Sequence, residues 1–565
     1  MSASPALRSA DPEVPDAPPE VEPPSKFAGR PELQASPTPT AAPAPMPAPR
    51  AAGYMLASLL LALTQGLGMN LISANLPQIQ GAIGATATEA TWLMAAYMAP
   101  NVSLSLALIK IRNQYGLRNF AELSILGFVI VASMHLFVDD LHSALVVRFL
   151  SGIVAAPMST LCFLYMLEPF APARKLTVGL SLALTSLSLG MPVARLISPG
   201  LLQIGLWHGL HVAEIALALM AFAAVYLLPL TPQPRAKVIE LLDIVSFLLI
   251  ATGFGLTAVV LTLGRLYWWF EAPWLGMMLA GGVASVTLAA VIELNRKSPL
   301  VDIRWLASPE VIHFTGALLI FRIILSEQTT GAVGFLQALG LTNDQTAVLY
   351  GITLASSIAG GLACAAVMKP GREQWIHVVA LALLMGGAFM DSHATSLTRP
   401  EQMLLSQAMI AFAGSLFLPP ALASGLMSAL KRGPNYILSF VIIFLTTQSI
   451  GGLLGSATLG TYLTVRTKVH AASLVQRIVL TDPVVAQRVS QLEAAYGRVI
   501  TDKAQLGTQG LNLLNQQVTR ESNVLAYNDL FLLVAALAGL ALAALLIHMA
   551  ILALGRLVAD PQPAN

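Results

Sequence analysis

Residues 142–166, HSALVVRFLSGIVAAPMSTLCFLYM, form an apolar run in which Arg148 is the one charged residue. A helix that crosses the hydrocarbon core of a bilayer needs roughly 20 consecutive, mostly apolar residues. Inside the bilayer the backbone has no water to bond to, so it satisfies its own hydrogen bonds as a helix. This stretch therefore predicts a membrane-spanning helix.

The same pattern recurs along the chain. Apolar residues make up 56% of the sequence and charged residues 11%, whereas about 25% of a soluble protein is charged. We predict an all-α membrane protein with fourteen transmembrane helices. The predicted spans are approximately residues 54–76, 90–109, 119–138, 142–166, 176–202, 208–230, 240–263, 273–294, 311–337, 345–368, 375–391, 402–429, 434–464 and 528–556.

Positive charge alternates between the connections of these spans. Every second short connection carries lysine or arginine, 14 residues in all, whereas the intervening short connections hold only Arg265 and Arg399. Basic loops of membrane proteins stay in the cytoplasm. With an even number of spans, both termini are then expected in the cytoplasm. The 14 residues are Lys110, Arg112, Arg118, Arg174, Lys175, Arg235, Lys237, Arg296, Lys297, Arg304, Lys369, Arg372, Lys431 and Arg432.

Composition also suggests the division of the chain. Residues 1–50 hold 14 of the 35 prolines, which predicts a disordered cytoplasmic tail over 1–51. We expect an N-terminal six-helix half (52–230), two inserted helices with a linker (231–307), a C-terminal six-helix half (308–556) and a cytoplasmic tail (557–565), a repeat architecture that transporters use. The polar segment 466–527 is expected outside the cytoplasm, as two helices that extend the last two spans.

Several classes of function are disfavoured. A net charge of +2 gives no reason to expect a nucleic-acid partner. The sequence contains no Gly-x4-Gly-Lys-Ser/Thr motif, the loop that binds ATP phosphates, so ATP-driven transport is disfavoured. The nine histidines are dispersed, so an enzyme is not expected. Cys162 and Cys364 lie within predicted spans, where thiols act as small packing residues.

Ionisable side chains inside the spans are the main functional candidates, because each costs at least ~2.5–3.5 kcal/mol to insert. Arg148, Arg195 and Glu214 are expected at one depth, within roughly 3 Å at 1.5 Å rise per residue. Glu214 could then pair with either arginine. The alternative is an ion pair that merely holds three helices in register. His208, His211 and Glu214 also share one helix face, where a proton relay or a metal site is a further alternative, although no fourth ligand is evident.

The ninth span carries Arg322 and Glu327 near the bilayer midplane. On a continuous helix they point roughly 140° apart, so each needs a partner on another helix or in a cavity. Glu327 is our candidate for a carboxylate that binds and releases a proton. The alternative is an ion pair with another span. Asp391, at the outer end of the eleventh span, is expected to be solvated.

Two motifs resemble a known family. Arg148-Phe-Leu-Ser-Gly152-Ile-Val-Ala155-Ala156-Pro157 resembles the Arg-x-x-Gln-Gly-x-Gly-Ala-Ala/Gly motif of the major facilitator superfamily. Asn70-Leu-Ile-Ser73-Ala-Asn75-Leu76-Pro77 is similar to the end of the Leu-Asp-x-Thr-x-x-Asn-Val-Ala-Leu-Pro motif of its fourteen-span drug:proton antiporters, the EmrB/QacA type. The resemblance covers about residues 52–556. It implies the major facilitator fold in the inner (cytoplasmic) membrane of a bacterium.

The family resemblance implies a secondary active transporter that exports small amphipathic or drug-like compounds by proton antiport and alternating access. It also implies a periplasmic adaptor protein and an outer-membrane channel as partners. Two departures matter: Gly68 stands where the family motif has Asp, and Arg195 stands where the motif of the fifth span has Pro. A proton-independent facilitator or uniporter on the same fold, and a non-transporting sensor, therefore stay open as alternatives.

Two overlapping sets of residues are the candidates for function. The proton-coupling candidates are Glu327, Glu214, Arg148, Arg195 and Arg322. The substrate-cavity candidates are Asn70, Ser73, Trp92, Arg148 and Glu327. No catalytic residue, metal ligand or cofactor is predicted.

Overall fold

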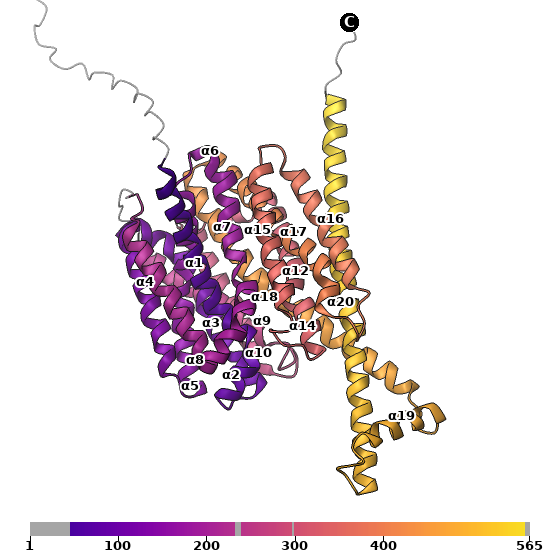
Figure 1. Cartoon of the computed structure of the whole chain (residues 1–565). Coiled ribbons are helices and arrows are strands. Elements are labelled where there is room, and N and C mark those ends of the chain that lie inside the picture. Colours follow the sequence, from indigo (N-terminus) through magenta and orange to yellow (C-terminus); the bar gives the residue numbers. More distant parts are fainter. Residues whose placement is uncertain (1–45, 232–238, 297–298, 560–565) are drawn as a thin grey trace, which may run out of the picture. The chain divides into compact units, whose positions relative to one another are not determined.

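The computed structural model describes residues 46–231, 239–296 and 299–559, and these ranges contain helices but no β-strand (Figure 1). Most of the predicted tail over 1–51 and the linker residues 232–238 lie outside the described residues. Within the described residues, the predicted tail boundaries at residues 51 and 557 need correction. Helix α1 begins at Ala48 and helix α20 ends at Ala559, because the helical backbone continues past the apolar core of each span.

Ten helical elements cover the predicted N-terminal half. They are α1 (Ala48–Ala74), α2 (Leu76–Ala82), α3 (Ala87–Tyr115), α4 (Leu117–Met134), η1 (His135–Phe137), α5 (Leu141–Leu167), α6 (Pro172–Arg174), η2 (Lys175–Gly179), α7 (Leu180–Ser188) and α8 (Gly190–Leu227). The inserted region contributes α9 (Leu241–Leu263), α10 (Pro273–Leu294) and α11 (Ile303–Leu306).

The remaining elements cover the predicted C-terminal half. They are α12 (Pro309–Leu325), α13 (Glu327–Thr330), α14 (Ala332–Ala338), α15 (Ala347–Val367), α16 (Glu373–Asp391), η3 (Pro400–Met403), α17 (Leu404–Arg432), α18 (Pro434–Arg477), α19 (Pro483–Ala494) and α20 (Lys503–Ala559).

In the described part of the chain, 11 helices are long and apolar enough to cross a membrane. One of them is the 53-residue stretch Lys175–Leu227, whose backbone leaves the helical conformation at Gly205 and Leu206. The long helices α3 and α18 are not among the 11. The all-α membrane fold is therefore confirmed, whereas the number fourteen stays a prediction.

Local sequence explains where several helices begin. The Thr86 hydroxyl accepts a hydrogen bond from the Glu89 backbone N–H (3.2 Å), and the Glu89 carboxylate accepts one from the Thr86 N–H (2.8 Å). This reciprocal pair satisfies two donors at the start of α3 that have no partner within the helix. Asp140 and Ser143 form the same arrangement before α5. Proline in the first turn begins α10 and α12, where a missing N–H is tolerated.

Apolar packing separates mainly along the predicted halves. One core cluster gathers side chains of α1, α3, α4, α5 and α8 with Ala258 of α9, and another gathers those of α12, α14 to α18 and α20 with residues of α7 and α11. Helices α1 and α8 approach closely at Gly66 and Gly190, where a Cβ on Gly66 would lie 2.9 Å from the Gly190 Cα. Only glycine allows two helix backbones to meet at this distance.

An ion-pair network joins the inserted helices to the N-terminal region at their predicted cytoplasmic ends. Lys110 on α3 pairs with Asp243 on α9 (2.7 Å), and Arg296 after α10 pairs with Asp243 (2.8 Å), Glu240 (2.9 Å) and Glu293 (3.0 Å). Most of these groups are largely buried, so solvent screens the network less than a surface pair.

The last two spans continue as helices into the predicted extracytoplasmic segment 466–527. Helix α18 runs to Arg477 and α20 starts at Lys503, while the position of this segment outside the cytoplasm stays a prediction. The short helix α19 packs against α20 (Figure 1). Asp529 on α20 accepts hydrogen bonds from Arg466 and His470 on α18, both at 2.6 Å, which ties the bases of the two long helices together.

Candidate functional site

The helix of the predicted ninth span is interrupted at its ionisable residue. Helix α12 ends at Leu325, and a four-residue helix, α13, starts at Glu327. Gly331, with a non-helical ψ of −94°, then separates α13 from α14. The angle of roughly 140° between Arg322 and Glu327 therefore stays a prediction, whereas their partners do lie on different helices, α18 for Arg322 and α17 for Glu327. Interrupted helices in transporters commonly carry substrate and ion sites.

The Glu327 carboxylate is fully buried at this interruption. Its Oε1 accepts hydrogen bonds from Gln407 Nε2 on α17 (3.0 Å) and from the Ala332 N–H (3.2 Å). Its Oε2 has no hydrogen-bond partner among the described residues. The alternative prediction, an ion pair with another span, finds no support in the described side chains, since none of the ion pairs there involves Glu327.

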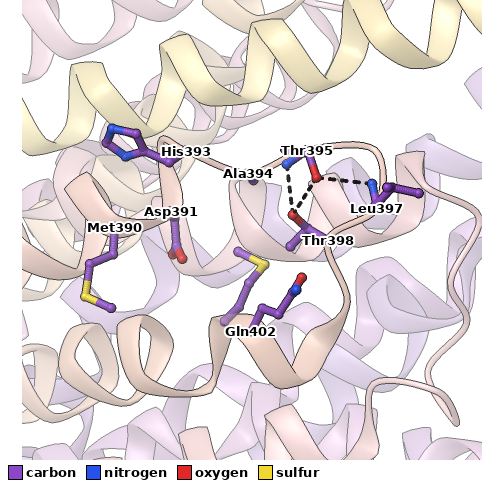
Figure 2. A pocket seen from close by; sticks show the side chains of 9 residues that line it. Met390, Asp391, His393, Ala394, Thr395, Leu397, Thr398 and Gln402 are labelled. Carbon is purple, nitrogen blue, oxygen red and sulfur yellow. Dashed lines mark hydrogen bonds between the residues drawn. The ribbon is translucent and has the colours of Figure 1, made fainter.

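Asp391 does not lie in solvent as expected. It is 4% exposed at the end of α16, where its Oδ2 accepts a hydrogen bond from Gln407 Nε2 (2.8 Å) and its Oδ1 accepts one from the Ser406 hydroxyl. The expectation was wrong because α17 covers the outer end of α16. Asp391 also lines a cavity of about 330 Å³, together with Met390, His393, Thr395 and Thr398 (Figure 2).

Arg322 lies one turn before the interruption, and the Arg322 Nε donates to the Gln448 carbonyl on α18 (3.2 Å). The side chain packs on Gly451 and Gly452, which leave room for it. Arg322 is a half-buried cation without a carboxylate within 4 Å in the described part of the chain.

In the N-terminal region, Arg148 and Glu214 both adjoin Gly68. The Arg148 Nη1 donates to the Gly68 carbonyl (2.7 Å), and its guanidinium lies 4.5 Å from the centre of the Tyr97 ring. A Cβ built on Gly68 would come within 2.7 Å of the Glu214 Oε1. The carboxylate of Glu214 therefore takes the space that a side chain at position 68 would need.

The expected pairing of Glu214 with an arginine was wrong in detail. The Glu214 Oε2 lies within hydrogen-bond distance of His211 Nδ1 (3.4 Å), one turn earlier on α8, and not of an arginine nitrogen among the described residues. His211 stacks on His135 with 4.2 Å between ring centres, whereas the His208 ring is tilted by 41° against Trp207. The ligand atoms of His135, His211 and Glu214 lie within 4.8 Å of one another. The Arg148 guanidinium bonds to Gly68, which lies against Glu214, and this positive charge disfavours a metal cation at the cluster.

Arg195 belongs to a different contact, which joins the two predicted halves. Its Nη1 donates to Asn343 Oδ1 (2.9 Å) in the loop before α15. The Asn343 amide donates to the Ala74 carbonyl (3.0 Å), to Asn75 Oδ1 (3.3 Å) and to the Ser198 hydroxyl (3.4 Å). We call these residues, on α1, α8 and the loop, the outer contact, since the predicted orientation places them near the extracytoplasmic side. Glu214 was expected to reach Arg195 because depth alone was considered, and depth does not fix lateral neighbours.

The loop of the outer contact has its own supporting bonds. Asp344 accepts a hydrogen bond from the Thr342 hydroxyl, which holds the pKa of the Asp344 carboxyl below its usual range. The Thr346 hydroxyl donates to the carbonyls of Thr342 and Asn343, both at 3.1 Å. These bonds fix the loop that presents Asn343 to the other helices.

The predicted substrate-cavity residues do not all come together. Asn70 donates to the Gly66 carbonyl of its own helix (2.7 Å), and the Ser73 hydroxyl donates to the Asn70 carbonyl (3.3 Å). Both are half-buried on the same stretch of α1 as Gly68. Trp92 instead donates from Nε1 to the Tyr267 hydroxyl (3.2 Å) and stacks on Trp274, so it packs against the inserted helices.

Gln407, Asn343 and His135 contact candidate residues but were not predicted from the sequence. Gln407 had a usable signal, because a polar side chain well inside a predicted span needs a partner. Asn343 lies in a short polar loop and His135 at the end of a span, where such residues are common. Nothing in their local sequence distinguished them.

Comparisons with known proteins agree with the resemblance. The family model described as Major Facilitator Superfamily matches residues 58–456. Fatty acid resistance protein FarB of Neisseria gonorrhoeae is 26% identical over 266 residues, which cover 45% of this chain and 51% of FarB. Multidrug export protein EmrB of Escherichia coli strain K12 is 22% identical over 488 residues, which cover 84% of this chain and 91% of EmrB.

A solved structure gives the same fold. The crystal structure of the human organic anion transporter MFSD10 matches with a TM-score of 0.53 and 12% sequence identity, covering 87% of this chain and 100% of that one. This likeness concerns the fold alone. The alignment with FarB spans about half of that relative, so the relatives' substrates are not thereby assigned to this chain.

Proposed function

Because this chain belongs to the Major Facilitator Superfamily, we propose that it exports small amphipathic compounds from the cytoplasm in exchange for protons, by alternating access. Fatty acids and amphipathic drugs are the substrate classes to examine first, since FarB is named for fatty acid resistance and EmrB for multidrug export. We place the protein in the inner membrane with both termini in the cytoplasm.

The observation that carries the proton exchange is the setting of Glu327. A carboxylate buried in an apolar interior is costly when ionised and unpaired. Glu327 has no ion-pair partner among the described residues, and the described atoms leave its Oε2 free to take a proton. It also lies at the interruption between α12 and α14, where a change of protonation can alter the local backbone.

A second carboxylate argues against the proton-independent facilitator. That alternative was suggested by Gly68, which replaces the acid of the family motif. The Glu214 carboxylate lies against Gly68 and beside Arg148, so a carboxylate is present at this place although it comes from α8. We therefore propose Glu214 as the second proton-coupling residue, with Arg148 as its neighbouring cation.

Alternating access requires contacts that close one side and then open. The outer contact supplies such a closure, because Asn343 and Arg195 connect the loop before α15 with α1 and α8. We assign Arg195 to this closure. Arg322 is proposed to support the interrupted span through its bond to Gln448.

The extracytoplasmic ends of α18 and α20, with α19, are the proposed contact for a periplasmic adaptor protein. The segment is largely exposed, and apolar side chains such as Val484 and Val499 lie on its surface. An adaptor and an outer-membrane channel stay proposals that rest on the likeness to EmrB.

The proposal is tested by measuring proton movement during transport. The purified protein is reconstituted in proteoliposomes with a pH-sensitive dye, and a long-chain fatty acid or an amphipathic cationic dye is added as substrate. We expect substrate-induced proton movement in the parent protein and none in Glu327→Gln, which still allows downhill flux. Glu271→Gln, which alters an exposed carboxylate in the loop between α9 and α10, is the matched control.

Two results decide against the proposal. Unchanged proton coupling in Glu327→Gln eliminates this residue as the titrating group. Parent flux that ignores an imposed pH gradient selects the facilitator instead.

A further inference from the structure

Asp391 is a buried carboxylate that the proposed proton exchange does not use. Gln407 links it to Glu327, because Gln407 Nε2 donates to both Glu327 Oε1 (3.0 Å) and Asp391 Oδ2 (2.8 Å). The two hydrogens of an amide group lie about 120° apart, so these carboxylate oxygens are about 5 Å from each other. One water molecule, or a small movement of Gln407, is enough to connect them.

The two carboxylates differ in what surrounds them. Asp391 lines the cavity of about 330 Å³ at the end of α16, with His393, Thr395 and Gln402 (Figure 2). The residues around this cavity do not include Glu327, which is 0% exposed behind Gln407. In the predicted orientation the cavity lies on the extracytoplasmic side. A proton from that side reaches Asp391 before it reaches Glu327.

Few charged or titratable groups surround this pair. His393 and Arg399 lie in the loop at the cavity, where Arg399 donates to the Thr398 carbonyl (3.0 Å). Helix α20 contributes Tyr527, which packs against α14, and α12 contributes Arg322, which is bonded to Gln448. From α17 the neighbours are the uncharged Ser406 and Gln407. None of the cations forms an ion pair with Asp391 or Glu327 in the described part of the chain.

We propose that Asp391 takes up the proton from the extracytoplasmic cavity and transfers it to Glu327, and that Gln407 controls the transfer by holding both carboxylates. This inference rests on the proposed proton exchange and adds the route by which the proton arrives. An O–H bond forms on Asp391 at the expense of hydronium in the cavity. When Gln407 releases its hydrogen bonds, that O–H bond breaks and another forms on Glu327, whose Oε2 is without a partner among the described residues.

The test separates loading of the proton from its storage. Three measurements are made on the full-length protein: the number of protons that the detergent-purified protein releases on binding substrate, the rate of net antiport in proteoliposomes, and the rate of substrate exchange. Substrate exchange, in which one substrate molecule leaves as another enters, does not require protonation of the transporter. The variants are Asp391→Asn, Asp391→Glu and Glu327→Gln, with Asp139→Asn as the matched control, because Asp139 is an exposed carboxylate on the same predicted side.

We expect Asp391→Asn to release as many protons as the parent and to exchange substrate at the parental rate, while its net antiport slows by roughly tenfold or more. Asp391→Glu should restore net antiport, and Asp139→Asn should behave as the parent. Glu327→Gln should release fewer protons than the parent, since it lacks one of the two proposed proton-coupling carboxylates.

Three outcomes for Asp391→Asn overturn the inference. Net antiport at the parental rate shows that Asp391 is not on the route. Loss of proton release shows that Asp391 itself stores the proton. An equal slowing of exchange shows a structural role only. A parent protein that releases no proton refutes the proposed function itself, and this is seen before any variant is compared.

Discussion

Replacing Asn343 with alanine should open the outer contact. The Asn343 amide bonds Ala74, Asn75 and Ser198, and its oxygen accepts from the Arg195 guanidinium. An amide has two hydrogens, so we count two neutral hydrogen bonds of about 1 kcal/mol each and one bond to a charged group of about 1.5–3 kcal/mol. The closed arrangement therefore loses about 3.5–5 kcal/mol, and the ratio of outward-open to closed protein should rise by a factor of roughly 10² or more.

Cysteine accessibility measures this shift directly. The native Cys162 and Cys364 are both 0% exposed, so the background labelling is low. Ser198→Cys places a thiol at a fully buried position of the outer contact, and a membrane-impermeant maleimide added outside should label it far faster when Asn343→Ala is also present. The matched control is Asn295→Ala, which removes an amide that donates to the Val291 carbonyl of its own helix.

The reasoning is refuted if Ser198→Cys is labelled at the same rate with and without Asn343→Ala. In that case the outer contact is not what closes this side. Faster labelling in the Asn295 control as well points to general loosening of the protein.

Three further predictions follow from packing and ion pairs. Gly68→Ala should reduce proton-coupled transport by about tenfold, because its Cβ displaces the Glu214 carboxylate, whereas Gly53→Ala, whose Cβ would have an ordinary contact of 3.4 Å, should not. Gly68→Asp combined with Glu214→Ala should recover coupling. Equal transport by these three variants and the parent would contradict this account. Gly152→Ala should lower the free energy of unfolding by about 1–3 kcal/mol, since its Cβ would clash with the Tyr97 carbonyl, whereas Gly127→Ala should be near neutral. Thermal unfolding in detergent measures both variants. Equal unfolding temperatures for the two would count against the close approach of α3 and α5. Asp529→Asn should weaken the contact between the bases of α18 and α20 by about 0.5–1 kcal/mol, a small amount because the ion pairs of Asp529 with Arg466 and His470 are partly exposed. Limited proteolysis of residues 466–527 should then be faster, and an unchanged rate would show that these ion pairs are dispensable.

The sequence was a good guide to the membrane fold and a poorer guide to breaks within helices. Apolar runs of about 20 residues predict spans because hydrocarbon admits few other structures. The interruption at Glu327 left no such signal, since Ser326 and Glu327 do not themselves break helices. It is Gly331, four residues later, that leaves the helical conformation, and lone glycines are common in membrane helices.

The candidate site shows the same limit. Counting residues along spans gave Arg195 and Glu214 a common depth, but which helices are neighbours depends on packing across the whole bundle. Arg195 consequently bonds Asn343, which is 148 positions away in the chain. Asp391 was misjudged for a related reason, because burial at the end of a helix depends on what another helix places over it. Glu327 is buried and has no ion pair among the described residues, and its role stays a proposal.

The continuity of α18 and α20 across the predicted membrane boundary has a mechanical consequence. Residues 503–527 correspond to roughly 37 Å of rigid helix beyond the span, at 1.5 Å per residue. Such a lever turns a tilt of about 10° at its base into a displacement of roughly 6 Å at its tip. Any protein bound at that tip then senses, through position alone, which way the transporter faces.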